Sequence, residues 1–460
     1  MKSTSFGSAV VIGGSMAGIL AARVLADYFE TVTLVERDPR TPQPEPRRGV
    51  PQGRHAHALL LRGQQTVFRL FPEARRALLD AGAVMLNMGR DMRWFHFGVW
   101  KCRYDSALEG VSASRPLIEW TLGEQLRRCG NVEALDGWSV DSVMYDGERI
   151  NGVRLRRRGS ETTQMLRSDL VVDASGRGSQ LPLQLQAFGL PRPVESVVKV
   201  DVGYATRIYR AAPGSRDWKA LYIISHPPGK RGALILPLEH DRWIVTLVGM
   251  HGDHPPADEA GFLAFAKSLP VPDMYDAVRH AQPLTEITRY GHPANLRRHY
   301  EQLRRFPPGL LVLGDALCSF NPVYGQGMSA ASMYADALQH CLESRVRSGW
   351  SLDDLWRSFF PRAAAAADMP WQLATSEDFR HVETQGPRGP VMRFLHWYTS
   401  KVQVASGVDP LSAERLYEIM HLLKPATALF RPDILMRLAV PGTRRRVGYA
   451  VAFSEASKPS

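Results

Sequence analysis

Short apolar runs alternate with amphipathic segments at the start of the chain. Residues 9–12 (AVVI) are apolar and β-branched and are followed by glycine, which predicts a buried parallel strand. Residues 17–29 place apolar positions on one face at helical spacing, and residues 31–35 predict a second strand. This strand–helix–strand order is typical of an α/β fold with a parallel sheet.

Further along the chain, helices and strands of two kinds are predicted. The elements are helices at 57–70, 115–128 and 328–342, an aromatic strand at 92–101, a hairpin of 139–143 and 150–155, buried strands at 170–173 and 310–313, and strands at 197–209, 221–225, 232–237 and 243–250. The last four strands predict a separate antiparallel sheet, and the pattern is helical from residue 352 onward. Because the strand at 310–313 is of the same buried type as the early ones, we expect a discontinuous nucleotide-binding domain with a sheet domain inserted into it.

A glycine-rich loop joins the first predicted strand to the first helix. Gly13, Ser15 and Gly18 occupy the three glycine positions of the dinucleotide pattern G-x-G-x-x-G, with serine at the second. The loop residues expected at the cofactor are Gly13, Ser15, Met16, Ala17 and Gly18. Glu36 ends the second strand, where a carboxylate binds ribose hydroxyls. The complete unit predicts a dinucleotide site; a glycine turn without a ligand is the alternative.

A second constellation late in the chain favours FAD over a nicotinamide dinucleotide. Asp315 follows the buried strand at 310–313, where it can accept hydrogen bonds from a ribityl chain. Gly325, Gly327 and Met328 stand at the start of a predicted helix, whose backbone N–H groups can donate to the pyrimidine edge of a flavin. A bare nicotinamide site does not need this second element; an acidic cap before an ordinary helix is the alternative.

These motifs resemble the FAD-dependent monooxygenases of the para-hydroxybenzoate hydroxylase superfamily, and most of all the polyether epoxidases of the monensin and lasalocid pathways. The resemblance spans residues 8 to 345. It rests on the fingerprint with Glu36, the loop 49–57 (GVPQGRHAH), Arg115 in RPLIEWTL, and the segments 173–179 (DASGRGS) and 314–331 (GDALCSFNPVYGQGMSAA). It implies a Rossmann-like FAD-binding domain of the GR2 type, an inserted mixed or antiparallel substrate sheet, and a helical C-terminal region.

The resemblance also implies a domain division. The FAD-binding domain takes residues 1–90, 115–190 and 288–345, the substrate domain takes the strand segment 91–114 and the sheet 191–287, and residues 346–460 form the helical region. Within this region, residues 421–440 are apolar but are broken by Pro425 and Pro432, so they are too short to span a bilayer. They either pack on the FAD domain and close the substrate entrance, or touch a membrane surface while Arg444–Arg446 meet anionic lipid.

Individual residues outside the fingerprint acquire roles from the resemblance. Arg115 reaches the pyrophosphate, Arg37 lies beside the adenosine, Arg54 contacts the flavin or its phosphates, Val140 presents its backbone to adenine, and Pro322 and Val323 line the flavin ring. For each arginine, a solvated surface side chain is the alternative.

The chain departs from the family pattern at several positions. Cys318 stands where histidine is usual, and the DASG motif lacks its trailing arginine, a feature linked to nicotinamide binding. The electron source therefore stays open between NAD(P)H and a partner flavin reductase. A halogenase is not expected, because the sequence contains no W-x-W-x-I-P motif and no halogenase-type lysine segment.

Aromatic residues of the predicted strands are expected to line a pocket for an apolar substrate. They are Trp94, Phe95, Phe97, Trp100, Tyr204 and Trp243, beside Pro322 and Val323. Ordinary sheet core is the alternative for each. The resemblance implies that reduced flavin and O2 form a C4a-hydroperoxide that transfers one oxygen atom, so the protein excludes water and holds the substrate. This chemistry needs no side-chain nucleophile, and no catalytic side chain is named.

The first functional hypothesis is thus an FAD-dependent monooxygenase, an epoxidase or hydroxylase of apolar, natural-product-like molecules in secondary metabolism. A flavin-dependent reductase of prenyl double bonds, like the geranylgeranyl reductases, shares the fold and a DASG-type motif. A basic nucleotide-binding scaffold without turnover is the non-enzymatic alternative. Oxygen dependence separates the first two, and flavin absorbance separates both from the scaffold.

Composition narrows the partners and the location. Hydrophobic residues make up 44% and charged residues 22%, which excludes disordered, collagen-like and coiled-coil classes. The net charge of +11 attracts anions, but the basic runs are short and no nucleic-acid motif accompanies them, so no nucleic-acid partner is expected.

Sparse cysteines and an interrupted N-terminal run indicate a cytoplasmic protein. The four cysteines form no CxxC pair, which fits a reducing cytoplasm. The uncharged run at 3–22 is broken by Gly13 and Gly14, which argues against a signal peptide or a membrane span. His55 and His57 lack further metal ligands nearby, so no metal is expected. At most weak membrane-surface association is expected.

Overall fold

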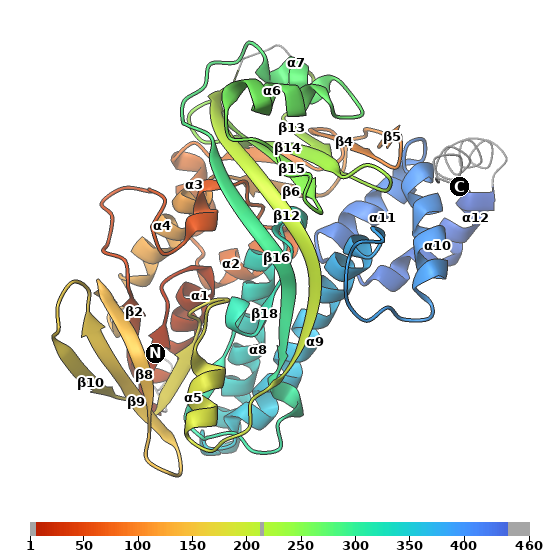
Figure 1. Cartoon of the computed structure of the whole chain (residues 1–460). Helices are drawn as coiled ribbons and strands as arrows, with labels where there is room; N and C mark the ends of the chain where they lie inside the picture. Colours follow the sequence, from red (N-terminus) through yellow and green to blue (C-terminus); the bar gives the residue numbers. More distant parts are fainter. Residues whose placement is uncertain (1–5, 212–215, 440–460) are drawn as a thin grey trace.

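A parallel sheet forms the first core of the computed structural model, which describes residues 6–211 and 216–439 (Figure 1). The strand order is β17-β11-β1-β2-β7. The strands are β1 (Phe6–Ile12), β2 (Phe29–Glu36), β7 (Val132–Asp136), β11 (Leu170–Asp173) and β17 (Leu310–Val312). Segments from the start of the chain and from beyond residue 300 therefore belong to one sheet, in which β11 lies between β1 and β17, and this confirms the predicted Rossmann-like α/β fold.

Helices and a small antiparallel sheet flank the parallel strands. The helices are α1 (Met16–Leu25), α2 (Leu61–Leu70), α3 (Ala74–Asp80), α4 (Arg115–Leu126), α5 (Leu181–Ala187) and α8 (Gly327–Ser348). The small sheet, in the order β10-β9-β8, consists of β8 (Trp138–Tyr145), β9 (Ile150–Arg157) and β10 (Thr163–Arg167). α1 packs between the sheet and α8, so its side chains are almost all buried.

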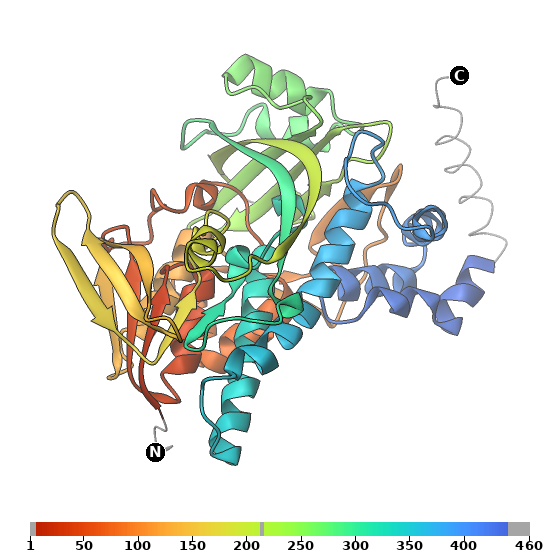
Figure 2. The same ribbon diagram turned by 60° about the horizontal axis from the view of Figure 1, so that its bottom comes forward.

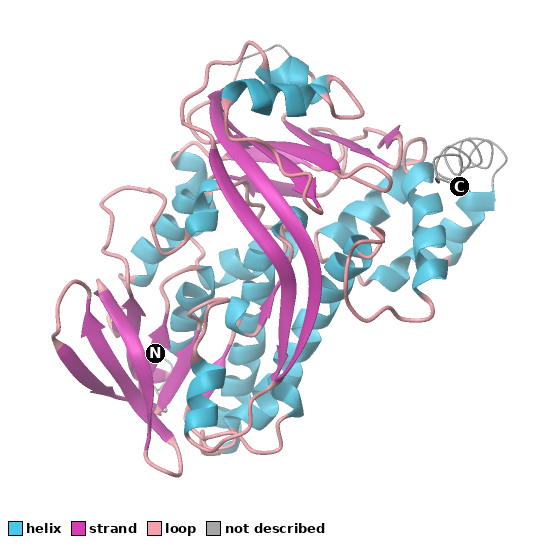
Figure 3. Cartoon of the chain, viewed as in Figure 1, coloured by secondary structure: helices cyan, strands magenta, loops and turns pink. Residues whose placement is uncertain are grey.

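A larger sheet stands beside this domain, and its long curved strands β12 (Val194–Arg210) and β16 (Thr288–His299) reach down toward it (Figure 3). The order is β18-β16-β12-β15-β14-β13-β4-β5. The other members are β4 (Met92–His96), β5 (Val99–Trp100), β13 (Ala220–Ile223), β14 (Arg231–Leu238), β15 (Arg242–Met250) and β18 (Cys318–Ser319). β13 and β4 run parallel, so the inserted sheet is mixed.

The two faces of the large sheet have different cores. α6 (Glu259–Lys267) and α7 (Asp273–Val278) cover one face and bury Phe95 and Trp243 there, with Trp100 partly buried against the same core. α10 (Met392–Ala405) and α11 (Pro410–Met420) cover the other face, where Trp94 is buried. Because neighbouring residues of a strand point to opposite faces, Phe95, Trp100 and Trp243 belong to the core under α6 and α7. The expectation that they line a substrate pocket beside Trp94 is wrong.

Several elements differ from those predicted. The helix expected at 57–70 begins at Leu61, because the preceding residues are extended. The aromatic strand at 92–101 is a hairpin, since Phe97 (φ 53°) and Gly98 (φ 71°) form a turn. β7, β16 and the short pair β3 (Val84–Asn87) and β6 (Glu109–Ser112) were not predicted. β16 pairs along β12, which places residues 288–299 with the large sheet, whereas the proposed division assigns them to the FAD-binding domain.

Helices make up most of the C-terminal region. α9 (Leu355–Asp378) runs along α8 and contains Pro361 and Pro370, and α10, α11 and α12 (Pro432–Ala439) follow. In Figure 2 the dark blue helices α10–α12 lie on the opposite side of the molecule from the yellow strands of the small sheet.

The apolar segment expected at 421–440 is partly a core element. Leu422, Leu429 and Ile434 are buried, and the latter two pack against the α10 side of the large sheet, whereas Leu435 and Met436 of α12 are exposed. Val440 and the arginines at 444–446 lie outside the described residues. We find no helix between residues 6 and 439, the unplaced 212–215 aside, that is long and apolar enough to cross a bilayer.

The placement of Trp243 yields a stability prediction. Its indole is 6% exposed and lies 5.9 Å from the ring of Trp218, centroid to centroid. Replacing Trp243 with Ala should lower the free energy of unfolding by about 3–5 kcal/mol, because it leaves a cavity under α6 and α7. Urea unfolding followed by circular dichroism measures the change. The control Trp350→Ala, at a side chain that is 60% exposed, should change the stability little; equal effects would contradict the core assignment.

Candidate functional site

A cleft of about 510 Å³ opens at the carboxyl ends of the parallel strands. Its wall includes the loop between β1 and α1, the ends of β2 and β11, part of β8, and the segment that joins β17 to α8. Tyr290 and His292 of β16 also line it, so the cleft lies where the parallel sheet meets the large sheet. Ligands of open α/β sheets bind at this edge.

The loop between β1 and α1 has the close backbone approaches that its glycines predict. Gly13 has φ +101°, and a Cβ at this position would lie 2.6 Å from the carbonyl oxygen of Ala174. At Gly18 an added Cβ would lie 1.7 Å from the carbonyl oxygen of Gly13. The missing side chains therefore let α1 begin directly against the strand, with Ser15 as the residue before the helix.

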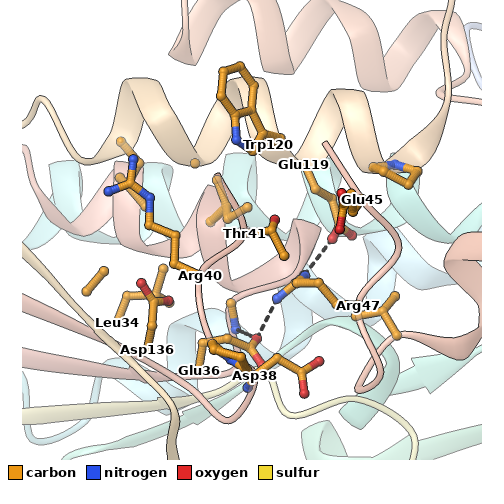
Figure 4. Close-up of a pocket in the computed structure, with 18 of the residues that line it drawn as sticks. Leu34, Glu36, Asp38, Arg40, Thr41, Glu45, Arg47, Glu119, Trp120 and Asp136 are labelled. Carbon is orange, nitrogen blue, oxygen red and sulfur yellow. Dashed lines mark hydrogen bonds and ion pairs between the residues drawn. The ribbon is translucent and has the colours of Figure 1, made fainter. Parts of the chain in front are cut away.

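Glu36 ends β2 as predicted, but its carboxylate is already bound by the protein (Figure 4). It accepts hydrogen bonds from the backbone N–H groups of Gly14 (2.8 Å) and Asp38 (2.9 Å). It also pairs with Arg47 at 2.9 Å, and Arg47 pairs in turn with Glu119 at 2.5 Å. Glu36 thus shapes the loop as well as lining the cleft.

Arg115 is held in place by three neighbours. Its guanidinium donates to Glu119 (2.8 Å), to the hydroxyl of Ser15 (2.9 Å) and to Nε2 of His57 (2.8 Å). His57 Nδ1 lies 2.9 Å from the carbonyl oxygen of His55, which can only accept, so Nδ1 carries the proton and Nε2 is free to accept from Arg115. Burial, together with Arg115, lowers the pKa of His57 to about 3, which agrees with a neutral ring.

Glu119 is the centre of this charge cluster. Ser15 Oγ donates to it at 2.6 Å, beside the contacts from Arg115 and Arg47. Burial acts to raise the pKa of this carboxyl, but Arg115 and Arg47 outweigh burial and bring it to about 2. Sequence reasoning missed Glu119 and Arg47. The spacing Arg115-x-x-x-Glu119, which joins side chains on one helix face, is the signal that points to the first.

Asp315 follows β17 and faces the cleft without a partner. In residues 6–211 and 216–439 no hydrogen bond or ion pair satisfies its carboxylate, although the charges of Arg115 and Arg177 act on it. Burial raises the pKa of Asp315, and the two arginines oppose that effect. A carboxylate in this position is ready to accept hydrogen bonds from a polyol.

The start of α8 supplies donors on the same wall. Gly325 has φ +64° and ends the short turn η4 (Pro322–Tyr324), and α8 then begins at Gly327. The first N–H groups of a helix have no partner within it, and Gln326 provides no side-chain cap. Gly327, Met328 and Asp315 all line the cleft. This donor and acceptor set, with the glycine loop opposite, fits the pyrimidine edge, ribityl chain and pyrophosphate of FAD.

A buried carboxylate holds the turn η4 in place. Asp378, at the end of α9, is inaccessible to solvent and accepts hydrogen bonds from Asn295 (2.7 Å), Asn321 (2.8 Å) and Tyr324 (2.9 Å). Tyr204 donates to Asn321 at 2.8 Å. Burial outweighs these contacts and raises the pKa of Asp378 to about 6. No local sequence signal relates Asp378 to the cleft.

His55 ends a hydrogen-bond chain on the sheet face near the cleft. Ala56 N–H donates to Thr246 Oγ1 (3.4 Å), Thr246 and Thr206 hydroxyls are 2.8 Å apart, and Thr206 Oγ1 is 2.8 Å from His55 Nδ1. If Thr246 donates to Thr206 and Thr206 donates to His55, every hydroxyl hydrogen has an acceptor. His55 then carries its proton on Nε2, a buried donor that no other described residue satisfies.

The structure brings most of the predicted cofactor residues together. The cleft is lined by Gly13, Ser15, Met16, Ala17, Glu36, Arg37, Arg115, Val140, Asp315, Gly325, Gly327 and Met328. Gly18 shapes the loop from behind, and Arg54 is exposed and lies away from the lining. Of the pocket candidates, Pro322 lines the cleft and Val323 lies next to it, Tyr204 bonds to the turn, and Phe97 stacks on His226.

One group of side chains has the composition of a metal site. His251, His381 and Glu383 place their ligand atoms within 4.8 Å of one another. Glu383 is, however, paired with Lys230 at 2.9 Å, which neutralises the carboxylate that a cation would need. The group lies outside the cleft lining.

Comparisons with known proteins agree with this geometry. A family model described as FAD binding domain matches residues 8–369. Protein Rv3254 of Mycobacterium tuberculosis (strain ATCC 25618 / H37Rv) is 34% identical over 346 residues, 73% of each chain.

Solved structures share the fold. The flavin-dependent brominase Bmp2 has a TM-score of 0.65 at 13% identity, with 96% of this chain and 100% of that chain covered. A flavoprotein/dehydrogenase from Cytophaga hutchinsonii has a TM-score of 0.66 at 14% identity, with 97% and 99% covered. PqsL, a probable FAD-dependent monooxygenase from Pseudomonas aeruginosa, has a TM-score of 0.56 at 20% identity, with 82% and 97% covered.

The close approach at Gly18 makes this residue a test of the phosphate loop. Gly18→Leu should give insoluble or flavin-free protein, because its Cβ would overlap the carbonyl oxygen of Gly13. Soluble yield and flavin absorbance after purification measure the effect. Gly123→Ala in α4 is the control, since its Cβ meets a flexible arginine side chain at 3.2 Å. A stable yellow Gly18→Leu protein would show that the loop is wrongly placed.

Asp315 allows a quantitative test of cofactor binding. Asp315→Ala should weaken FAD binding roughly 10- to 100-fold, the effect of losing charge-assisted hydrogen bonds. Asp315→Asn keeps a neutral acceptor and should fall between the variant and the wild type. Quenching of FAD fluorescence during titration measures the affinity. Asp353→Ala, at an exposed carboxylate, is the control; unchanged affinity in folded Asp315→Ala would remove Asp315 from the site.

Proposed function

Because the chain belongs to the FAD binding domain family, we propose that it is a flavin-dependent monooxygenase. In this proposal it inserts one oxygen atom from O2 into an apolar, natural-product-like substrate, by epoxidation or hydroxylation. The second oxygen atom leaves as water, and NAD(P)H or a partner flavin reductase supplies the two electrons. Within this proposal, the motifs of the chain resemble those of the polyether epoxidases.

The observation that carries the proposal is the position of the cleft against the large sheet. Tyr290 and His292 of the sheet line the same cleft as Asp315 and the start of α8. A substrate on the sheet face would therefore meet the flavin edge of the cofactor rather than its adenosine end. Bound and reduced FAD supplies the activation of O2.

The residues of this chain have three tasks in that reaction. Ser15 and Arg115 face the site of the pyrophosphate, and Asp315 and the first N–H groups of α8 orient the flavin. Asn321 and Asp378 hold the turn η4 rigid, so that Pro322 keeps a fixed place in the cleft. The apolar face of the sheet excludes water and positions the substrate.

Oxygen dependence is the decisive test. Purified FAD-loaded protein is given a reductant, with and without an added flavin reductase, and a bacterial extract in the presence of chloride and bromide. Mass spectrometry should find products heavier by one oxygen atom, and heavy-isotope O2 should label them. Turnover without O2 to products that gain two hydrogens would support the prenyl reductase. Halogenated products would also contradict the proposal.

A protein that binds FAD but transforms nothing under any of these conditions would favour the non-enzymatic scaffold. Reductant consumption by the purified protein alone would assign NAD(P)H as the direct donor, whereas a strict need for the added reductase would assign a partner. Cytoplasmic location and weak membrane-surface association remain predictions.

A further inference from the structure

Buried polar side chains gather where β4 and β5 meet α10, at the edge of the large sheet farthest from β18. Trp94, His96, Lys101 and Gln403 are 3%, 3%, 4% and 8% exposed. Within the described chain, Trp94 Nε1 has no hydrogen-bond partner, and the His96 ring and Gln403 Oε1 have none outside the cluster, since the Gln403 side chain is the group that faces the His96 ring. Because an unpaired buried polar atom costs free energy, such a cluster is typical of a site that a ligand completes.

Lys101 adds a buried amine to this cluster. Its Nζ donates to the backbone carbonyl of Gln403 (2.5 Å) and lies 5.1 Å from the ring centroid of Trp94. No carboxylate among residues 6–211 and 216–439 pairs with it, since the nearby Glu377 is bound to Arg380 at 2.8 Å. Burial lowers the pKa of Lys101 well below its usual range. A carboxylate placed here would favour the protonated form of Lys101, which no acidic side chain of the described residues neutralises.

Strand register connects this cluster to the cofactor end of the sheet. Successive paired residues across five neighbouring strands are Trp94, Tyr222, Leu234, Thr246 and Thr206. Paired residues point to the same face, and four strand spacings cover about 19 Å. Thr206 contacts His55 near the cleft, so one row of side chains runs from the cleft to the lysine.

We propose that Lys101, with His96 and Trp94, binds the carboxylate of a substrate whose apolar body lies along this row. Lys101 Nζ and Trp94 Nε1 donate to the carboxylate oxygens, and a ring N–H of His96 provides a further donor. The contact is purely non-covalent. The anion site stands on its own geometry, while its use in oxygen insertion rests on the proposed function.

Calorimetry on the FAD-loaded full chain tests the site. The probes are octanoate and its neutral counterpart octanamide, and saturation with FAD keeps the pyrophosphate loop occupied. Octanoate should bind at least ~10-fold more tightly than octanamide, the effect of a charge-assisted hydrogen bond. Binding should also take up a proton, because a carboxylate raises the pKa of Lys101; titration in two buffers of different ionisation enthalpy measures this. Equal affinities for the two probes would overturn the proposal, and this result needs no variant.

Lys101→Met separates a ligand site from a structural lysine. The variant should bind octanoate roughly 10- to 100-fold more weakly and octanamide unchanged. Without ligand it should melt at a higher temperature, because methionine fills the space without the free-energy cost of burying an amine. A lower melting temperature, or unchanged octanoate binding, would overturn the proposal. Lys401→Met, on the outer side of α10 over Trp397, is the matched control and should change neither measurement.

These binding experiments test the anion site independently of the proposed monooxygenase function. Tight octanoate binding that Lys101→Met abolishes supports the anion site even if no oxygenated product forms, in which case the oxygenase assignment alone fails. Oxygenation of neutral molecules with equal binding of the two probes would keep the oxygenase and remove the anion site.

Discussion

Asp378 joins three parts of the chain that are far apart in sequence. Its carboxylate ends α9 and accepts hydrogen bonds from Asn295 of β16 and from Asn321 and Tyr324 of the turn before α8. The C-terminal region, the large sheet and the cofactor cleft therefore share one buried charge. Taking away one partner of a buried charge costs about 3–5 kcal/mol when the remaining groups cannot compensate. The position of η4 in the cleft is thus tied to the packing of a helix that never reaches the cofactor.

The buried carboxylates of the phosphate loop are paired with arginines, whereas Asp378 is bound by neutral donors. Glu36 and Glu119 are balanced by Arg47 and Arg115, so the loop is close to neutral before any anion arrives. Ser15 and Arg115 are the donors of this network that also face the cleft. A pyrophosphate must compete with Glu119 for them. The ion-pair network therefore holds Ser15 and Arg115 in place before the pyrophosphate binds. The same network weakens the attraction for the pyrophosphate, because Glu119 already binds both donors.

The cofactor residues that the sequence predicted well are those at which the local backbone requires a particular residue type. Gly13 is required by its positive φ and Gly18 by the carbonyl oxygen of Gly13 one turn earlier, and Asp315 and Gly325 follow a strand and a turn, so residue type alone located them. Phe95 and Trp243 were misplaced because alternation shows that neighbours point to opposite faces without showing which helices cover each face. β16 was missed because Pro293 and several charged residues interrupt its pattern. Asp378 and Lys101 acquire their meaning from packing between distant elements, which leaves no local trace.

The row of side chains from Thr206 to Trp94 has buried polar groups at both ends, and the two ends satisfy them differently. Near the cleft, His55, Thr206 and Thr246 form a neutral hydrogen-bond chain that leaves a single nitrogen unsatisfied. At the far end, the Lys101 amine lies in an aromatic environment and donates to the backbone carbonyl of Gln403. A neutral hydrogen-bond chain costs little free energy, and it can stabilise the fold by itself or bind a ligand. Burying the lysine amine costs the fold free energy that an apolar residue of similar length would not. In the proposed binding mode, the carboxylate of the substrate therefore lies at the lysine and its apolar remainder extends toward the cofactor.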